Sequence, residues 1–107
     1  MFIEPPEAKK KLKDMIKYCL SIEAYAERYE KEKVEIPLEV RIRLAELFES
    51  YLEKLPKDVR ENYALGIYGI PGIIPLKEIP RLIREDVDFA NIIIRLFAYY
   101  AHKRGVE

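Results

Sequence analysis

Apolar residues recur at helical intervals through the first third of the chain, and this pattern limits the possible folds more than any other feature of the sequence. Alternating steps of four and three residues connect Ala8, Leu12, Met15, Cys19, Ile22, Ala26 and Tyr29. Such a heptad pattern predicts one helix of about 24 residues, about 36 Å long. A second apolar stripe widens this face beyond the contact strip of a two-stranded coiled coil, which favours a long helix packed within a bundle.

The helical pattern resumes after Pro37. The residues expected on the buried side of this second helix are Leu44, Phe48, Tyr51, Leu52 and Leu55, and the helix should end near Pro56. Apolar residues also alternate strictly between Val34 and Leu44, which is the periodicity of a strand. We favour the helix, because its pattern continues through Leu55 and no second strand is predicted to pair with residues 34–44.

Two shorter helices are expected in the second half of the chain. The first covers residues 57–65 and ends at Gly66, a suitable C-terminal cap. The second covers residues 76–84 and is interrupted at Pro80, because proline lacks the N–H that an interior helical position donates.

The last helix is expected over residues 89–103. Asp86 or Asp88 is placed to cap its N-terminus, and Gly105 is placed to stop it. Its apolar residues surround nearly the whole circumference. A helix of this kind belongs at the centre of a bundle or at a subunit interface.

An uncharged linker precedes these last elements, with the sequence Ile-Tyr-Gly-Ile-Pro-Gly-Ile-Ile-Pro over positions 67–75. Loops are usually polar, because their backbone and side chains face water. We therefore expect this linker to pack under the flanking helices or against another molecule. The residues expected at such an interface are Ile67, Tyr68, Ile70, Ile73 and Ile74, together with Tyr99 and Tyr100 of the last helix.

The composition limits the class of protein. Lys and Arg number 19, as do Asp and Glu, so the net charge is zero, and any contact with nucleic acid must use a local patch. The single cysteine, Cys19, excludes an internal disulfide and suits a reducing compartment, so a cytoplasmic location without membrane association is expected. The lack of Thr, Gln and Trp beside abundant Lys, Glu and Arg resembles thermophile usage.

One local basic patch is evident near the start of the chain. Lys9, Lys13 and Lys17 share a helix face at spacings of four residues. Bases crowd the beginning of this helix and acids crowd its end, opposite to the order that the helix dipole favours. A phosphate or an acidic partner would explain this order, and a solvated face paired with neighbouring helices is the alternative.

Arg95 and His102 form the most enzyme-like pair. Seven residues apart on a helix, they point in nearly the same direction. A guanidinium stabilises phosphate charge and an imidazole moves protons near neutral pH. The spacing Arg-x6-His in a helical domain resembles the loosest form of the signature of HEPN ribonucleases. This resemblance implies metal-independent RNA cleavage at a site formed where two such helices meet in a dimer.

Together these patterns predict an all-α fold in a single domain, residues 1–107: a small bundle of four to five helices, with the apolar Gly/Pro linker before a central C-terminal helix. By size and helical class the chain resembles small helical subunits of nucleic-acid assemblies, including those of CRISPR effector complexes. We expect a noncatalytic interaction module or accessory subunit that binds a protein partner or a second copy of itself. The alternatives are a nucleic-acid-binding subunit using the local patch and a ribonuclease using Arg95 and His102. No cofactor or metal site is expected.

Overall fold

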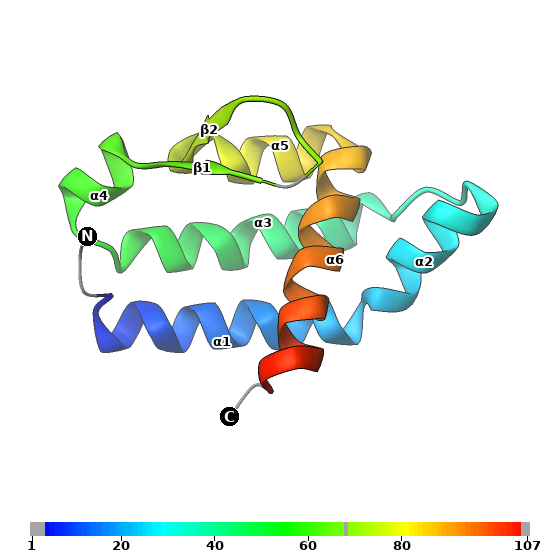
Figure 1. Cartoon of the computed structure of the whole chain (residues 1–107), viewed down its shortest axis with the longest axis horizontal. Helices are drawn as coiled ribbons and strands as arrows, with labels where there is room; N and C mark the ends of the chain where they lie inside the picture. The colour runs from blue at the N-terminus through cyan, green and yellow to red at the C-terminus, as the bar shows by residue number, and fades with distance from the viewer. Residues whose placement is uncertain (1–3, 68, 106–107) are drawn as a thin grey trace.

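Six α-helices make up most of the part of the chain that the structure, a computed structural model, describes, namely residues 4–67 and 69–105 (Figure 1). The helices are α1 (Pro6–Ser21), α2 (Glu23–Glu32), α3 (Leu38–Glu53), α4 (Lys57–Asn62), α5 (Ile79–Glu85) and α6 (Val87–Arg104). A short hairpin of β1 (Ala64–Gly66) and β2 (Ile73–Pro75) and a 3₁₀ turn, η1 (Leu76–Glu78), lie between α4 and α5. The predicted all-α class is confirmed.

Three helices form a layer that the last helix crosses. α3 contacts α1 on one side and α5 on the other, and α6 contacts α1, α2 and α5 (Figure 1). The buried apolar residues of these helices form one cluster, which includes Met15, Leu44, Ile83 and Ile94. The first and last helices of the chain are therefore neighbours. Within residues 4–67 and 69–105, no helix combines the length and apolar composition needed to cross a bilayer.

The first helix is shorter than its heptad pattern predicts, because the backbone breaks at Ile22. This residue has φ −109° and ψ 11°, outside the helical region, and α2 starts at the next position. The Ser21 hydroxyl donates a hydrogen bond of 2.6 Å to the Tyr18 carbonyl, which also accepts one from the Ile22 N–H. Such competition for a helical carbonyl is a known cause of bending. The expected helix of about 24 residues is thus two helices, and Ile22 stays buried at the break.

The hairpin is the second departure from the expected elements. The helix predicted over residues 57–65 ends at Asn62, and Ala64–Gly66 pairs antiparallel with Ile73–Pro75, with Leu65 opposite Ile74. The apolar linker therefore supplies the loop and the second strand of a hairpin. In contrast, residues 34–44 contain no strand, and α3 begins at Leu38, directly after Pro37, as the helical interpretation predicts.

The ends of the last two helices follow from single residues. Pro80 lies in the first turn of α5, where its missing N–H costs no helical hydrogen bond, so it begins that helix rather than interrupting it. The Asp86 carboxylate accepts a hydrogen bond of 3.1 Å from the Phe89 N–H and caps α6. At the other end, Gly105 has φ 80°, a conformation that glycine adopts without strain.

Helix α6 is buried on the side that faces the bundle and open on the other. Ile94 and Ala98 are completely buried, whereas Leu96, Tyr99 and Tyr100 are exposed. The nearly all-round apolar pattern of α6 thus has two parts, because its inner residues complete the core and its outer residues remain in contact with water.

Candidate functional site on the outer face of helix α6

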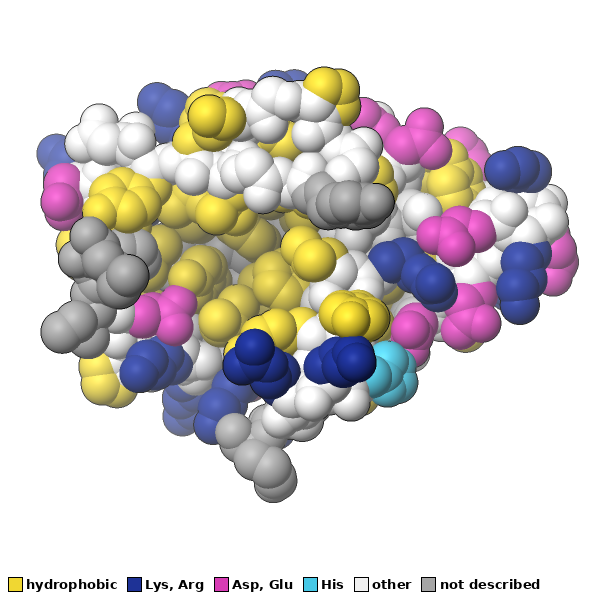
Figure 2. Space-filling model, in the orientation of Figure 1, with side chains coloured by type: hydrophobic (Ala, Val, Ile, Leu, Met, Phe, Trp, Pro, Cys, Tyr) yellow, Lys and Arg dark blue, Asp and Glu magenta, His cyan; other side chains and the backbone are white. Residues whose placement is uncertain are grey.

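Leu96, Tyr99 and Tyr100 define the outer face of α6. The exposed fractions are 42% for Leu96, 61% for Tyr99 and 47% for Tyr100. One turn further on, Lys103 and Arg104 place their cationic groups 5.8 Å and 5.9 Å from the ring centres of Tyr99 and Tyr100, respectively. Figure 2 shows apolar side chains gathered in a hollow on this side of the molecule, with Lys and Arg side chains along its lower edge and the histidine beside them. Exposed apolar groups of this kind are typical of binding surfaces.

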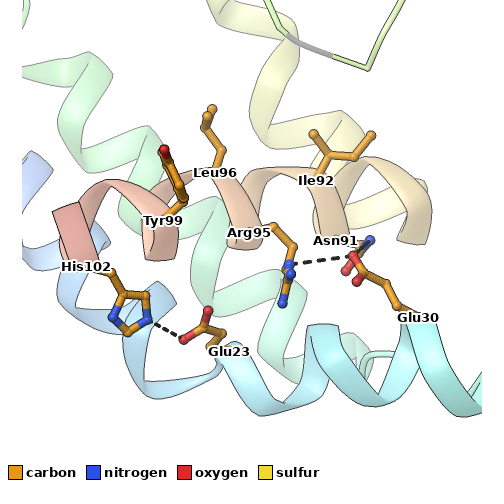
Figure 3. A pocket seen from close by; sticks show the side chains of 8 residues that line it. All are labelled: Glu23, Glu30, Asn91, Ile92, Arg95, Leu96, Tyr99 and His102. Atoms are coloured by element: carbon orange, nitrogen blue, oxygen red, sulfur yellow. Dashed lines mark hydrogen bonds and ion pairs between the residues drawn. The ribbon is translucent and has the colours of Figure 1, made fainter.

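A groove of about 730 Å³ separates the outer face from α2 (Figure 3). The residues that line this α2–α6 groove are Glu23, Glu30, Asn91, Ile92, Arg95, Leu96, Tyr99 and His102. His102 Nε2 lies 2.9 Å from Glu23 Oε1, and Arg95 Nε lies 3.6 Å from Glu30 Oε2. The break at Ile22 makes these contacts possible, because it allows α2 to run beside α6 with its acids facing the bases of α6.

Arg95 and His102 therefore share one groove, as their spacing of seven residues predicts. Each of them faces a carboxylate of α2. A phosphate that approached Arg95 or His102 would meet the carboxylate of Glu30 or Glu23, which already forms an ion pair with that side chain. The carboxylates would repel it, so the groove lacks the uncompensated positive charge that phosphate chemistry uses.

Asn91 is a polar residue of the same groove that sequence reasoning missed. Its amide Nδ2 donates a hydrogen bond of 3.0 Å to Glu30 Oε2, while its buried Oδ1 has no hydrogen-bond partner among the residues that the structure describes. A lone asparagine within an apolar helix was the available sequence signal, since buried polar groups are usually paired. The contact explains the position of Asn91, which holds Glu30 against α6.

Two further grooves border the outer face. The first, of about 520 Å³, is lined by Leu96, Phe97, Tyr99, Tyr100, Lys103 and Arg104. The second, the α1–α6 groove of about 340 Å³, is lined by Glu4, Lys9, Leu12, Lys13, Ile16, Tyr100, Arg104 and Gly105. Tyr100 and Arg104 belong to both grooves, so the hollowed surface is continuous from the outer face to α1.

The structure divides the predicted lysine patch. Lys9 and Lys13 line the α1–α6 groove, where Arg104 of the last helix joins them. Lys17 lines a different groove, between α1 and α3, with Asp14 and Arg43 among its neighbours. Two of the three lysines are thus brought together with a cation that is distant in the sequence, and the third is not.

The predicted linker interface is also divided. Ile67 and Ile74 are buried, and Ile70 is half-buried against the core. Ile73 has 72% of its side chain exposed, the largest exposed fraction among the large apolar residues described. Tyr68 lies outside the described residues. Only Ile73 of the described linker residues therefore offers a large apolar group to a partner, and sequence reasoning missed the exposed Leu96 of the outer face.

The one cysteine of the chain is remote from these grooves in reactivity, and the part of the chain that the structure describes shows no metal cluster. Cys19 is completely buried, and this burial raises the pKa of its thiol to about 12. In residues 4–67 and 69–105, no group of three or more His, Cys, Asp and Glu side chains is arranged to hold a metal ion.

Comparisons with protein-family models, with curated proteins and with solved structures found no match for this chain.

Proposed function

We propose that this chain is a noncatalytic interaction module, an accessory subunit that binds another protein through the outer face of α6. The exposure of Leu96, Tyr99 and Tyr100 on a helix whose opposite face is core carries the proposal. The exposure of these side chains to water contributes nothing to the stability of a monomer. Covering the remaining exposed half of each would contribute about 1 kcal/mol per side chain, on the scale of 1.5–3 kcal/mol for full burial.

The chemistry of the outer face supports a protein as the partner. Tyrosine joins a large apolar ring to a polar tip and is enriched where binding energy concentrates in protein interfaces. Lys103 and Arg104 lie next to the two rings and supply a polar rim to the apolar centre. The grooves on either side of the face give a partner side chain places to insert.

Affinity capture with an outer-face variant and a surface control tests the proposal. Leu96→Asp combined with Tyr99→Asp places two charges on the outer face, whereas Leu38→Asp places one on an apolar residue that is 55% exposed on α3. We expect the wild type and Leu38→Asp to retain the same bound protein and the outer-face variant to lose it. Equal retention by all three proteins would refute the proposal.

Mass measurement in solution separates self-association from binding to a different protein. Size-exclusion chromatography with light scattering, run over a range of concentrations, gives the oligomeric state of the wild type and of the outer-face variant. A dimer that the outer-face variant loses would identify the partner as a second copy of the chain. A monomer at every concentration would direct the search to a different protein.

The ribonuclease alternative predicts cleavage of RNA without divalent metal, lost in both Arg95→Ala and His102→Ala. The carboxylates of Glu23 and Glu30 beside these residues weigh against it. In the capture experiment the same two variants should bind as the wild type does, because neither removes an apolar group of the outer face.

A further inference from the structure

The α1–α6 groove gathers three cations from opposite ends of the sequence. Lys13 lies one helical turn after Lys9 on α1, and Arg104 lies in the last turn of α6. None of the three has an ion-pair partner in the described part of the chain. Glu4 is the one acid among the described lining residues, and its carboxylate accepts a hydrogen bond from the Tyr51 hydroxyl. The groove therefore carries net positive charge in a chain whose total charge is zero.

An exposed aromatic ring borders the same cations. Tyr100 keeps 47% of its surface exposed, and the Arg104 guanidinium lies 5.9 Å from the centre of its ring. Behind them, half-buried Leu12 and buried Ile16 provide apolar surface. A ligand that matches this groove has an anionic group for the cations and a flat, weakly polar ring for Tyr100.

We propose that the α1–α6 groove binds a nucleotide unit, with its phosphate on Lys9, Lys13 and Arg104 and its base against Tyr100. Lysine provides point charges for phosphate oxygens, and arginine provides paired N–H donors in a fixed fork. Stacking of a base on an aromatic side chain tolerates any sequence, because every base has a π face. A duplex keeps its bases stacked on one another, so the unit is a free nucleotide or part of a single strand.

The site goes beyond the proposed protein-binding function. Tyr100 and Arg104 belong to both surfaces, but other residues distinguish the two. Lys9 and Lys13 lie on α1, apart from Leu96 and Tyr99, whose replacement defines the outer-face variant. Loss of nucleotide binding in a Lys13 variant therefore leaves protein capture unchanged, and loss of capture in the outer-face variant leaves nucleotide binding unchanged.

Lys17 supplies the matched control. It lies on α1 one turn after Lys13, and its replacement by Glu changes the net charge of the chain by the same amount. Because Lys17 lines the groove between α1 and α3, Lys17→Glu leaves the nucleotide site intact. A general effect of charge would weaken binding equally in Lys13→Glu and Lys17→Glu, whereas the site that we propose distinguishes them.

The experiment measures fluorescence anisotropy of a labelled single-stranded oligouridylate and of its DNA equivalent. With one phosphate neutralised by the three cations, affinity should fall about 2.5-fold between 50 and 200 mM salt, from a logarithmic slope of about −0.7. Lys13→Ala should weaken binding and make this slope less steep, and Tyr100→Leu should weaken binding about tenfold through loss of one base stack. Lys13→Glu and Arg104→Glu should abolish binding, and Lys17→Glu should bind as the wild type does.

Three results would overturn the proposal. The first is no binding of either oligonucleotide at about 100 µM and 50 mM salt, the weak limit of non-specific affinity. The second is equal weakening by Lys13→Glu and Lys17→Glu. The third is displacement of the oligonucleotide by an oligoglutamate of equal charge at equal concentration, which would make the groove a site for acidic peptides. Competition by adenosine monophosphate as strong as that by an unlabelled oligonucleotide would support the site and assign it to free nucleotides.

Discussion

Ile73 and Ile74 are consecutive residues of one strand that should respond in opposite ways to the same substitution. Ile74 is 9% exposed and belongs to the core cluster, whereas Ile73 is 72% exposed. The alternation follows from the pleat of β2, which directs successive side chains to opposite faces. Replacing each residue by Ala therefore compares a core position with a surface position at almost the same place in the chain.

The expected magnitudes follow from these exposed fractions. Full burial of an isoleucine contributes 1.5–3 kcal/mol, and nine-tenths of this amount corresponds to about 2 kcal/mol for Ile74. Ile73 has only about a quarter of its surface buried, so Ile73→Ala should cost about 0.5 kcal/mol. The cavity left at Ile74 adds to the larger value if the hairpin does not close over it.

Urea unfolding followed by circular dichroism at 222 nm measures both free energies of unfolding. With a slope of about 2 kcal/mol per molar urea, Ile74→Ala should lower the midpoint by about 1 M and Ile73→Ala by about 0.25 M. Equal shifts for the two variants would refute the register of the hairpin and the division of the linker into core and surface. If Ile73 also contacts a partner, Ile73→Asp should weaken partner capture while its midpoint stays close to that of the wild type.

Three further outcomes are expected from single groups. Asp86→Ala should lower the free energy of unfolding by about 1 kcal/mol through loss of the cap on α6, while Asp86→Asn, which keeps an accepting oxygen, should lose much less; thermal unfolding compares them. Because burial raises the pKa of Cys19 to about 12 from 9.0, its native thiol should react with iodoacetamide at pH 8 about a thousandfold more slowly than the thiol of the urea-unfolded chain. Hydrogen bonds from Arg84 lower the pKa of Glu49, so the stability that this pair contributes is present above pH 4.5 and is lost as the pH falls through the lowered pKa. Glu49→Gln should therefore destabilise the chain at pH 7 by no more than about 1 kcal/mol, and urea midpoints measured at successively lower pH should show this effect decrease below pH 4.5.

The helices that begin or end at a strong local signal were predictable from the sequence. Pro37 marks the start of α3, and Asp86 and Gly105 mark the ends of α6, because a fixed φ, a capping carboxylate and a permissive backbone act within one turn of the chain. The break at Ile22 was not predictable from periodicity, because the apolar spacing continues through it. The helices on both sides of the break bury apolar residues in the core.

The hairpin and the grooves depend on contacts between distant segments. The residues of Ala64–Gly66 have no strong preference for strands. This segment forms a strand because it pairs with Ile73–Pro75. In the same way, the spacing of Lys9 and Lys13 identified two cations of the α1–α6 groove, but no local pattern pointed to Arg104. The position of Lys17 in another groove depends on how α3 packs against α1, which helical spacing alone does not specify.

The contact between α1 and α6 has a consequence for the synthesis of the chain. A ribosome releases α1 before α6, so the apolar surface of α1 that α6 covers stays open until residues 87–104 have emerged. The fold therefore closes only after α6 has left the ribosome, through a contact with a high loop-closure cost. Chains that stop before Val87 would lack α6 and expose the buried face of α1, so a premature stop leaves a product prone to aggregation rather than a smaller folded protein.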